Sequence, residues 1–307
     1  MTSPRLWAIV GATGTGKTEL SLDLAERLAA AGREAEVVNA DAMQLYRGMN
    51  IGTAKLPEAA RRGIAHHLFD VLDVTDEAAV ARYQPTARAV IGAIHARDHD
   101  AILVGGSGLY VSSVIYDFQF PPRDDALRAD LERECDAHGV EPLIERLRDI
   151  APNVAAAVDA NNPRRVVRAL EVALLGGDAQ VTLPAAPKLW RANTRLIGTC
   201  ADRATLVERL DRRVEQMWAD GMLDEVRGLR SAGLERGRTA SRAIGYAQAL
   251  SQLRGEMRER QAIGEAQALT RRYARRQVSW FKRYEGVQWL DSTESAPRAS
   301  EIPSIVP

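Results

Sequence analysis

The stretch Leu6-Trp7-Ala8-Ile9-Val10, followed by Gly11-Ala12-Thr13-Gly14-Thr15-Gly16-Lys17-Thr18, decides how this chain folds. Its first five residues form an apolar run typical of a buried strand. From Glu19 to Ala31 apolar residues recur at helical spacing, and Gly32 ends the pattern. The segment in between matches the phosphate-binding pattern Gly-x-x-x-x-Gly-Lys-(Ser/Thr) at each defined position. We therefore predict a strand, a phosphate-binding loop and a helix.

Each part of this loop has a physical role in binding phosphate. Glycines let the backbone fold around phosphate oxygens, while the amides and the helix N-terminus supply partial positive charge. Lys17 adds a full charge, and the Thr18 hydroxyl is a candidate Mg²⁺ ligand. We expect a diphosphate or triphosphate to be bound by Gly11, Ala12, Thr13, Gly14, Thr15, Gly16, Lys17 and Thr18.

A carboxylate is predicted at the same edge of the sheet. Residues Glu36 to Asp41 read as a second strand, and Asp41 ends it. Ligands of open α/β sheets collect outside the carboxyl ends of the strands, so Asp41 and the loop should face one pocket. An acid at a strand end can simply cap the next turn. Beside bound phosphate, however, it can accept a proton from an attacking nucleophile.

The remaining patterns predict an α/β fold with a P-loop NTPase-like parallel sheet flanked by helices. A third strand at Ala101–Val104 follows a helical pattern over residues 78–97 and leads into Gly105-Gly106-Ser107-Gly108. No acid ends this strand, and the missing Walker B acid argues against ATP hydrolysis. The glycines lack the spacing of a dinucleotide fingerprint and are expected to form a tight turn.

The second half of the chain suggests a helical insertion. Residues 119–195 are charged and helix-forming, with the chain expected to return to the sheet through Pro184–Pro187 and a strand at 194–199. We assign residues 1–118 and 196–307 to the catalytic core and 119–195 to a helical insertion domain. The core should continue with helices over 203–232 and 243–284, and the tail after Asp291 should be loose.

Composition narrows the class of protein. Forty-one Lys and Arg residues balance 41 Asp and Glu residues, so the overall charge favours neither a nucleic acid nor an acidic partner. Cys135 and Cys200 form no metal or redox pattern and are expected to be ordinary small hydrophobes. His66-His67 lacks a third ligand and is expected to have a structural or polar surface role. No apolar run approaches the ~18 residues of a membrane span, and the first strand leaves no room for a signal peptide. We expect a cytoplasmic monomer.

Local clusters of positive charge contrast with this balance. Residues 270–284 contain Tyr273, Trp280, Phe281 and Tyr284 among six cations and no acid: Arg271, Arg272, Arg275, Arg276, Lys282 and Arg283. On a helix such cations can follow phosphates while the aromatic rings stack on unpaired bases. The alternative is a solvated charged face with Trp280 and Phe281 in the core. A second cluster at helical spacing consists of Arg164, Arg165 and Arg168. Two basic surfaces suggest a clamp on an RNA stem-loop, with the target base extruded between them.

Together these segments resemble a known family. The phosphate-binding loop is followed, in the expected order, by Asp41–Lys55, Val104–Tyr110, Asn162–Glu171, Arg242–Tyr246 and Arg275–Trp280. This arrangement is similar, over nearly the whole chain, to bacterial tRNA dimethylallyltransferases (tRNA isopentenyltransferases). The resemblance implies transfer of a dimethylallyl group from dimethylallyl diphosphate to the N6 amine of the adenosine just 3′ of the anticodon, with release of diphosphate. Such a reaction activates no water, which agrees with the missing Walker B acid.

The resemblance also implies roles for individual residues. Asp41 would take the proton of the attacking amine, while Thr13, Lys17, Arg213 and Mg²⁺ would act on the diphosphate. Contacts with the tRNA anticodon stem-loop are implied for Asp41, Ala42, Met43, Gln44, Ser107, Arg128, Arg164, Arg165, Arg168, Arg242, Gly245, Tyr246, Arg271, Arg272, Arg275, Arg276 and Gln277. Ala42 stands where many relatives have Ser, so one hydroxyl is missing near the adenine.

Other functions remain open from the residues alone. A small-molecule kinase would use Asp41 to deprotonate a hydroxyl acceptor. A nucleotide-switched RNA-binding protein would use the same loop and basic segments without covalent chemistry. An enzyme that prenylates free adenine nucleotides is a further alternative, but it would have no use for the basic segments.

Overall fold

The computed structural model describes residues 3–117, 120–177 and 187–302, and the chain divides into two compact units. The core unit comprises residues 1–117 and 189–307, and the inserted unit comprises residues 118–188. The predicted boundary at 118/119 and the start of the Pro184–Pro187 segment lie outside the described residues. The chain is back in the core by Leu189, which forms a β-bridge with Tyr116, several residues before the predicted return at 196.

The core unit contains a six-stranded sheet in the order β3-β2-β4-β1-β5-β6. All of its strand pairs are parallel, which confirms the predicted parallel sheet. The strands are β1 (Leu6–Gly11), β2 (Ala35–Asn39), β3 (His66–His67), β4 (Asp100–Gly105), β5 (Thr194–Cys200) and β6 (Val287–Asp291). The sequence patterns did not predict the edge strands β3 and β6. In β3, His67 hydrogen-bonds to Glu36 at 2.6 Å, so this histidine has a structural role.

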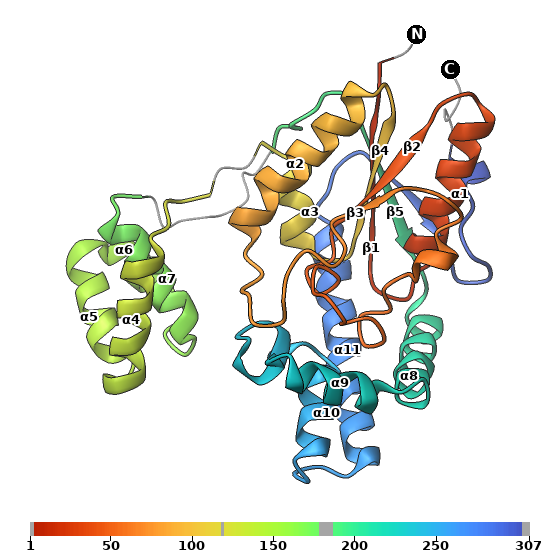
Figure 1. Cartoon of the computed structure of the whole chain (residues 1–307). Helices are drawn as coiled ribbons and strands as arrows, with labels where there is room; N and C mark the ends of the chain where they lie inside the picture. The colour runs from red at the N-terminus through yellow and green to blue at the C-terminus, as the bar shows by residue number, and fades with distance from the viewer. Residues whose placement is uncertain (1–2, 118–119, 178–186, 303–307) are drawn as a thin grey trace. The chain divides into compact units, whose positions relative to one another are not determined.

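Helices cover both faces of the sheet (Figure 1). Because strand side chains alternate, Trp7 and Ile9 point to one face, where α1 (Lys17–Ala30) and the short helix η4 (Ala299–Glu301) pack. Leu6, Ala8 and Val10 point to the other face, which is covered by α2 (Val80–Ala96), α3 (Gly108–Ile115) and α11 (Glu259–Phe281). Burial on both faces explains why the strands read as continuous apolar runs.

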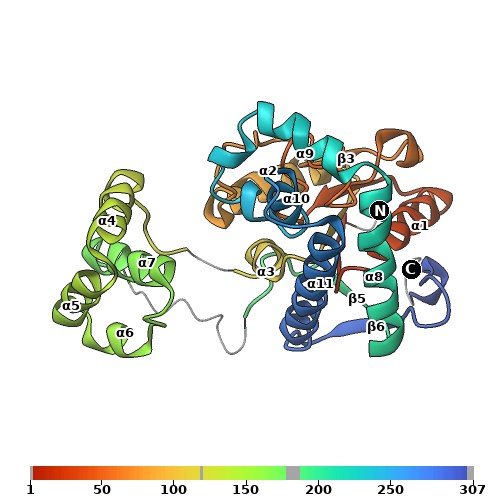
Figure 2. The same cartoon turned by 90° about the horizontal axis from the view of Figure 1, so that it is seen from below.

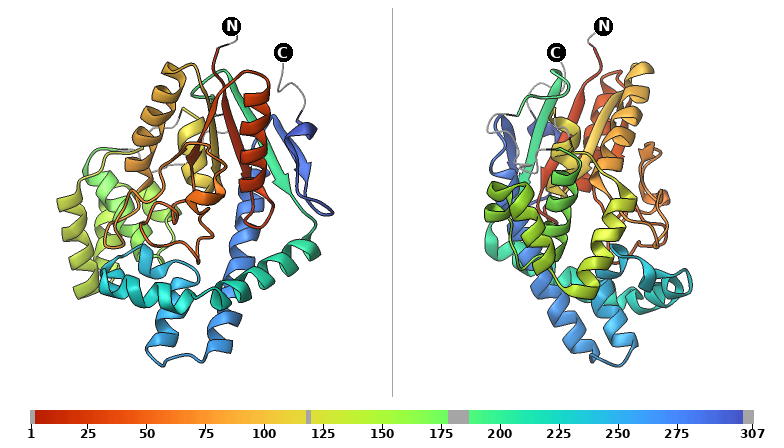
Figure 3. Two further views of the ribbon diagram at one scale, coloured as in Figure 1. Left: turned by 45° about the vertical axis from the view of Figure 1, so that its right-hand side comes forward. Right: turned by 90° about the vertical axis from the view of Figure 1, so that its left-hand side faces the viewer.

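A second helical layer lies beside the carboxyl ends of the strands. It consists of α8 (Arg203–Ala219), α9 (Met222–Ser231) and α10 (Tyr246–Leu253) with the turns η2 (Leu234–Arg236) and η3 (Ala240–Arg242), while the turn η1 (Glu58–Ala60) lies elsewhere in the core. The hairpin of α10 and α11 projects away from the sheet (Figure 3). Ala262 and Ala266 of α11 pack in this helical layer, whereas Phe281 packs under the sheet. One long helix therefore connects both parts of the core.

The tail after Asp291 is packed as far as Ile302, which corrects the prediction of a loose tail. Ser292 donates from its backbone N–H to the carbonyl of Cys200 at 2.7 Å. The N–H of Ala299 donates to Asp23 at 2.6 Å, and Ala299 and Ile302 are buried against the sheet. The tail is ordered because it covers apolar strand residues that α1 leaves open.

The inserted unit is helical, as predicted. It comprises α4 (Asp125–His138), α5 (Glu141–Ile150), α6 (Pro152–Ala157) and α7 (Pro163–Leu174). Asp124 caps the start of α4 and Asn162 caps the start of α7, each through its side-chain oxygen. Leu131, Leu143 and Leu170 belong to its separate apolar core.

Candidate active site at the phosphate-binding loop

The loop from Gly11 to Thr18 connects β1 to α1, as the sequence pattern predicts. The Lys17 ammonium donates to the carbonyl of Ala12 at 2.7 Å, which folds the side chain back over the loop. The Thr15 hydroxyl bonds to Thr199 at 2.6 Å and donates to Ala12 at 2.8 Å. Because Thr15 is only 1% exposed, its side chain fastens the loop to β5, and only its backbone is available to a ligand. Thr18 lies exposed in the first turn of α1.

Three charged groups meet at this loop. Burial lowers the pKa of Lys17 to about 8; the Asp41 carboxylate acts to raise that pKa, and the Arg213 guanidinium lowers it further. Burial also lowers the pKa of Arg213, against the opposing effect of Asp41. Two cations and one anion therefore interact electrostatically here: Lys17 from the loop, Arg213 from α8 and Asp41 from the segment after β2. Two cations around one anion leave an excess positive charge for a bound diphosphate.

The Asp41 carboxylate is held by its own turn. Asn39 accepts a hydrogen bond from the N–H of Asp41 at 2.9 Å and donates to the carbonyl of Leu68 at 2.9 Å. Asp41 Oδ1 accepts from the N–H of Met43 at 2.9 Å. Its Oδ2 has no hydrogen-bond donor within residues 3–117, 120–177 and 187–302, and it is therefore the oxygen that is available to accept a proton.

Helix α11 supports the loops that follow β1 and β4. Gln277 Oε1 accepts from the N–H of Thr13 at 2.9 Å, and its Nε2 donates to the carbonyl of Gly106 at 2.8 Å. One turn earlier, the Tyr273 hydroxyl lies 3.5 Å from Ser107 Oγ, which accepts from the N–H of Ala42 at 3.2 Å. Gln277 is buried, and both of its amide atoms are bonded to the loops.

The glycines after β4 make room for this helix. A Cβ atom on Gly106 would lie 2.3 Å from Gln277 Nε2, and one on Gly108 would lie 2.5 Å from the Trp280 ring. Both distances are far below van der Waals contact. The Gly105–Gly108 segment is therefore more than a tight turn, because it allows α11 to approach the backbone of the site.

The outer face of α11 is basic. Arg272, Arg275, Arg276 and Arg283 surround a shallow depression of about 460 Å³ with Ser279 and Trp280. The Arg283 guanidinium lies 4.6 Å from the centre of the Trp280 ring. We call these four arginines the basic face.

Other members of the predicted basic and aromatic cluster have structural roles. Arg271 pairs with Asp211 of α8 at 2.5 Å, so an acid from another element compensates this charge. Phe281 is 0% exposed, and the buried Tyr284 shares a 2.6 Å hydrogen bond with Ser112. Both rings belong to the core, which for Phe281 is the alternative that the sequence left open and for Tyr284 argues against stacking on RNA bases.

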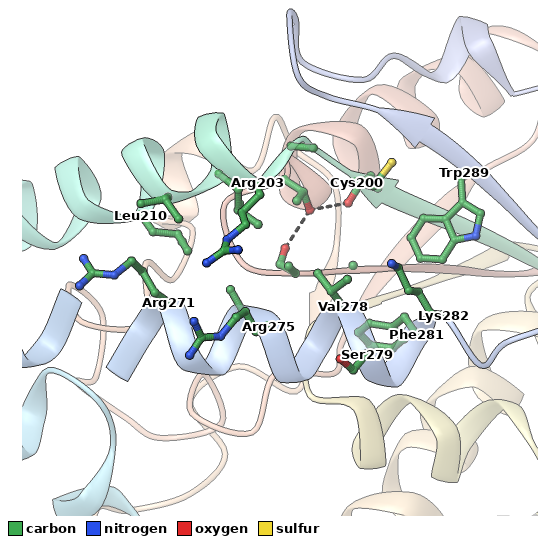
Figure 4. Close-up of a pocket in the computed structure, with 18 residues that line it drawn as sticks. Cys200, Arg203, Leu210, Arg271, Arg275, Val278, Ser279, Phe281, Lys282 and Trp289 are labelled. Carbon is green, nitrogen blue, oxygen red and sulfur yellow. Dashed lines mark hydrogen bonds between the residues drawn. The ribbon is translucent and has the colours of Figure 1, made fainter. Parts of the chain in front are cut away.

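An apolar pocket of about 800 Å³ lies between α8 and α11, which run side by side (Figure 2). Figure 4 shows Arg203 and Arg275 projecting into it from the two helices, with Trp289 at one end. Gly11, Ala12 and Thr15 also line it, but Lys17, Asp41 and Arg213 do not. The pocket therefore borders the phosphate-binding loop without including its charged groups.

Two further residues predicted to contact tRNA are buried in the second helical layer. The Tyr246 hydroxyl donates to Glu225 at 2.5 Å, and the N–H of Gly245 donates to Gln248 at 2.9 Å. They hold α10 against α9, and the direct contact of these two residues with tRNA stays a prediction. The neighbouring Arg242 is exposed, whereas Met43 and Gln44 are partly buried and Gln44 donates to the carbonyl of Thr53.

In the inserted unit the predicted RNA-binding arginines fall into two groups. Arg164 and Arg165 are exposed in the first turn of α7. Arg168 instead pairs at 2.7 Å with Glu171, whose carboxylate is fully buried, and Arg128 lies 3.9 Å from the same group. A buried carboxylate needs compensating cations, so Arg128 and Arg168 stabilise the fold of this unit.

Metal ligands are scarce in the part of the chain that the structure describes. No group of three or more His, Cys, Asp or Glu side chains there could hold a metal ion. Cys135 and Cys200 are both free thiols. Because the described residues offer no such group, a cation at this loop would depend on the exposed Thr18 hydroxyl and on oxygens of the ligand.

Within residues 3–117, 120–177 and 187–302, no helix is both long and apolar enough to cross a membrane.

Comparison with known proteins shows the family. Residues 44–284 match the profile of a family described as IPP transferase. The chain belongs to this family. A relative from Clavibacter sepedonicus named tRNA dimethylallyltransferase is 58% identical over 287 residues, which cover 94% of this chain and 93% of the relative. One of the same name from Leifsonia xyli subsp. xyli is 60% identical over 250 residues, covering 81% and 95% of the two chains.

Solved structures agree with this assignment to the IPP transferase family. A tRNA isopentenylpyrophosphate transferase from Bacillus halodurans is 39% identical, with a TM-score of 0.68 and coverage of 95% of this chain and 91% of that one. A eukaryotic dimethylallyltransferase acting on tRNA is 26% identical, with a TM-score of 0.79 and coverage of 95% and 75%. The predicted family and its P-loop NTPase-like fold are thereby confirmed. The family profile begins after Asp41, so the roles of the loop and of Asp41 depend on the geometry described above.

Proposed function

We propose that this IPP transferase family member transfers a dimethylallyl group from dimethylallyl diphosphate to the N6 amine of the adenosine 3′-adjacent to the anticodon in tRNA. The observation that carries the proposal is the cluster of Lys17, Asp41 and Arg213 at the phosphate-binding loop. The names of close relatives and of both solved structures support the same substrate classes.

The groups of the site can accept both the proton and the leaving group that this reaction releases. The amine nitrogen forms a bond to the allylic carbon as the carbon–oxygen bond to diphosphate breaks, and the nitrogen loses one proton. Asp41 Oδ2 accepts this proton, since Oδ1 is already engaged by Met43. Lys17 and Arg213 stabilise the charge that develops on the departing diphosphate. Diphosphate then remains in the loop until release.

We also propose that Mg²⁺ accompanies the diphosphate. Mg²⁺ commonly keeps several waters and binds through substrate phosphates with one or two protein groups. The exposed Thr18 hydroxyl at the start of α1 fits that role, and the lack of a carboxylate cage in the described residues agrees with an ion that arrives with its ligand. Bound there, the ion would neutralise part of the leaving-group charge.

The RNA partner that we propose is the anticodon stem-loop, bound partly by the basic face of α11. Its exposed arginines can neutralise phosphates, and the partly buried Trp280 and Tyr273 offer the aromatic surface that unpaired bases use. We also propose that the enzyme acts as a monomer. Because its substrate is tRNA, we place the enzyme in the cytoplasm.

A kinase is less consistent with the site, because β4 ends at Gly105 with no acid to orient Mg²⁺ and a nucleophile. Mass analysis of nucleosides from tRNA incubated with dimethylallyl diphosphate decides between the two. The proposal predicts a five-carbon addition to the adenosine beside the anticodon. Unmodified adenosine, together with phosphate transfer from ATP to a small acceptor, would favour the kinase instead.

A further inference from the structure

Gln277 has an unusual position for a residue of a basic, RNA-facing helix. Its side chain is only 3% exposed and points inward from α11, opposite to the basic face. Its amide oxygen and nitrogen are both used, by the N–H of Thr13 and by the carbonyl of Gly106. One side chain therefore joins the phosphate-binding loop after β1 to the turn after β4.

At neutral pH an amide of this length can make both bonds. The glutamine amide presents an acceptor oxygen and a donor nitrogen on a rigid plane, which matches one N–H and one carbonyl. A carboxylate at the same place would lack the donor, and asparagine would be one methylene too short. Gly106 leaves room for the Gln277 amide, since a Cβ atom there would lie 2.3 Å from its nitrogen.

The bond to Thr13 affects the ligand site directly. In phosphate-binding loops the backbone amides point at the phosphates. Here the Thr13 amide is engaged by Gln277, on the side of α11, while Lys17 is folded onto the carbonyl of the preceding Ala12. Gln277 therefore holds Thr13 in an orientation in which its hydroxyl, and not its N–H, is available to the ligand.

We propose that Gln277 is a positioning residue that sets the conformation of the phosphate-binding loop and makes no contact with tRNA. This inference rests on the proposed function only for the identity of the RNA and of the allylic substrate. Inorganic diphosphate is a sufficient probe of the loop itself.

The test compares Gln277→Met, which removes both hydrogen bonds at similar length, with the wild-type enzyme. Two buried bonds of ordinary strength correspond to about a 10-fold or larger loss of diphosphate affinity, measured by calorimetry. The dissociation constant of an anticodon stem-loop and its salt dependence should stay within about twofold of wild type. The matched control is Gln267→Met on the same helix, where Gln267 bonds to α8 and not to the loops. It should leave both affinities unchanged.

Gln277→Glu is a second variant that tests the same two hydrogen bonds if Gln277→Met does not fold, and it separates positioning from general stability. Its carboxylate can accept from Thr13 but cannot donate to Gly106, whereas the protonated carboxyl can do both. Diphosphate affinity relative to wild type should therefore recover as the pH falls toward 5. Unchanged diphosphate affinity in both variants, or weakened RNA binding with normal diphosphate binding, would overturn the inference. A wild-type enzyme that binds diphosphate but transfers no dimethylallyl group would refute the proposed function alone.

Discussion

At the scale of single residues, the most informative group is the ammonium of Lys17. Its pKa of about 8 is lower than that of an ordinary lysine because burial outweighs the attraction of Asp41. Only the protonated form attracts diphosphate, so affinity should fall as the pH rises through 8. Binding near that pH should also take up protons, because the anion raises the lysine pKa again.

Calorimetric titration with inorganic diphosphate between pH 7 and 9.5 measures this effect. In Lys17→Met the affinity should be lower at pH 7, and its decline with pH should be much flatter, since Arg213 stays charged throughout this range. A wild-type affinity that is constant up to pH 9.5 would contradict the role assigned to Lys17.

Sequence patterns predict the positions of some residues of this site but not the roles of others. The loop motif and Asp41 are local signals, because a strand end and a glycine pattern place them without reference to distant parts of the chain. The roles of Thr15 and Gln277 depend on partners more than 170 residues away, namely Thr199 and the pair Thr13 and Gly106. No local spacing encodes such contacts, so the burial of these side chains was not predictable.

At the scale of elements, α11 carries two functions on opposite sides. Its basic face should contribute to RNA binding in proportion to the charges that are not already paired. Arg275→Ala combined with Arg276→Ala should weaken stem-loop binding and lower the slope of log affinity against log salt by about 1.4, at roughly 0.7 for each phosphate contact with a single strand.

The single change Arg271→Ala provides the comparison for this helix. Because Arg271 is compensated by Asp211, we expect Arg271→Ala to change the salt slope by less than half as much as the double variant at Arg275 and Arg276. Fluorescence anisotropy over a series of salt concentrations measures all three slopes. An effect of Arg271→Ala as large as half that of the double variant would mean that the ion pair opens on RNA binding and that Arg271 contributes as the exposed arginines do.

At the scale of the whole molecule, the parallel sheet places the loop and Asp41 at one edge, and the packed tail completes the sheet. The apolar strand runs made the α/β class predictable. The packing of the tail was not predictable, because its Pro and Ser content suggests a loose segment. Two buried side chains, Ala299 and Ile302, instead hold it against the sheet. Strand β6 was missed for a similar reason, since its residues alternate weakly and gain order by pairing with β5.

The contribution of the tail to stability can be measured. Ile302→Ala removes a buried side chain and should lower the free energy of unfolding by about 2 to 4 kcal/mol. Leu109→Ala, at a position that is 38% exposed, is the control and should cost well under that amount. Urea denaturation of both variants gives the values. A loss below about 0.5 kcal/mol for Ile302→Ala would indicate a tail that is loose in solution.

Asp41→Asn removes the base that we assign to proton transfer from the attacking amine at the diphosphate site. The amide keeps the size and the Met43 contact of the carboxylate but is no longer a base. Dimethylallyl transfer to the anticodon stem-loop should fall by about 10²- to 10⁴-fold. Diphosphate affinity should be retained or increased, because an anion beside Lys17 has been removed. Wild-type transfer rates in this variant, measured by mass analysis of the RNA, would contradict the account.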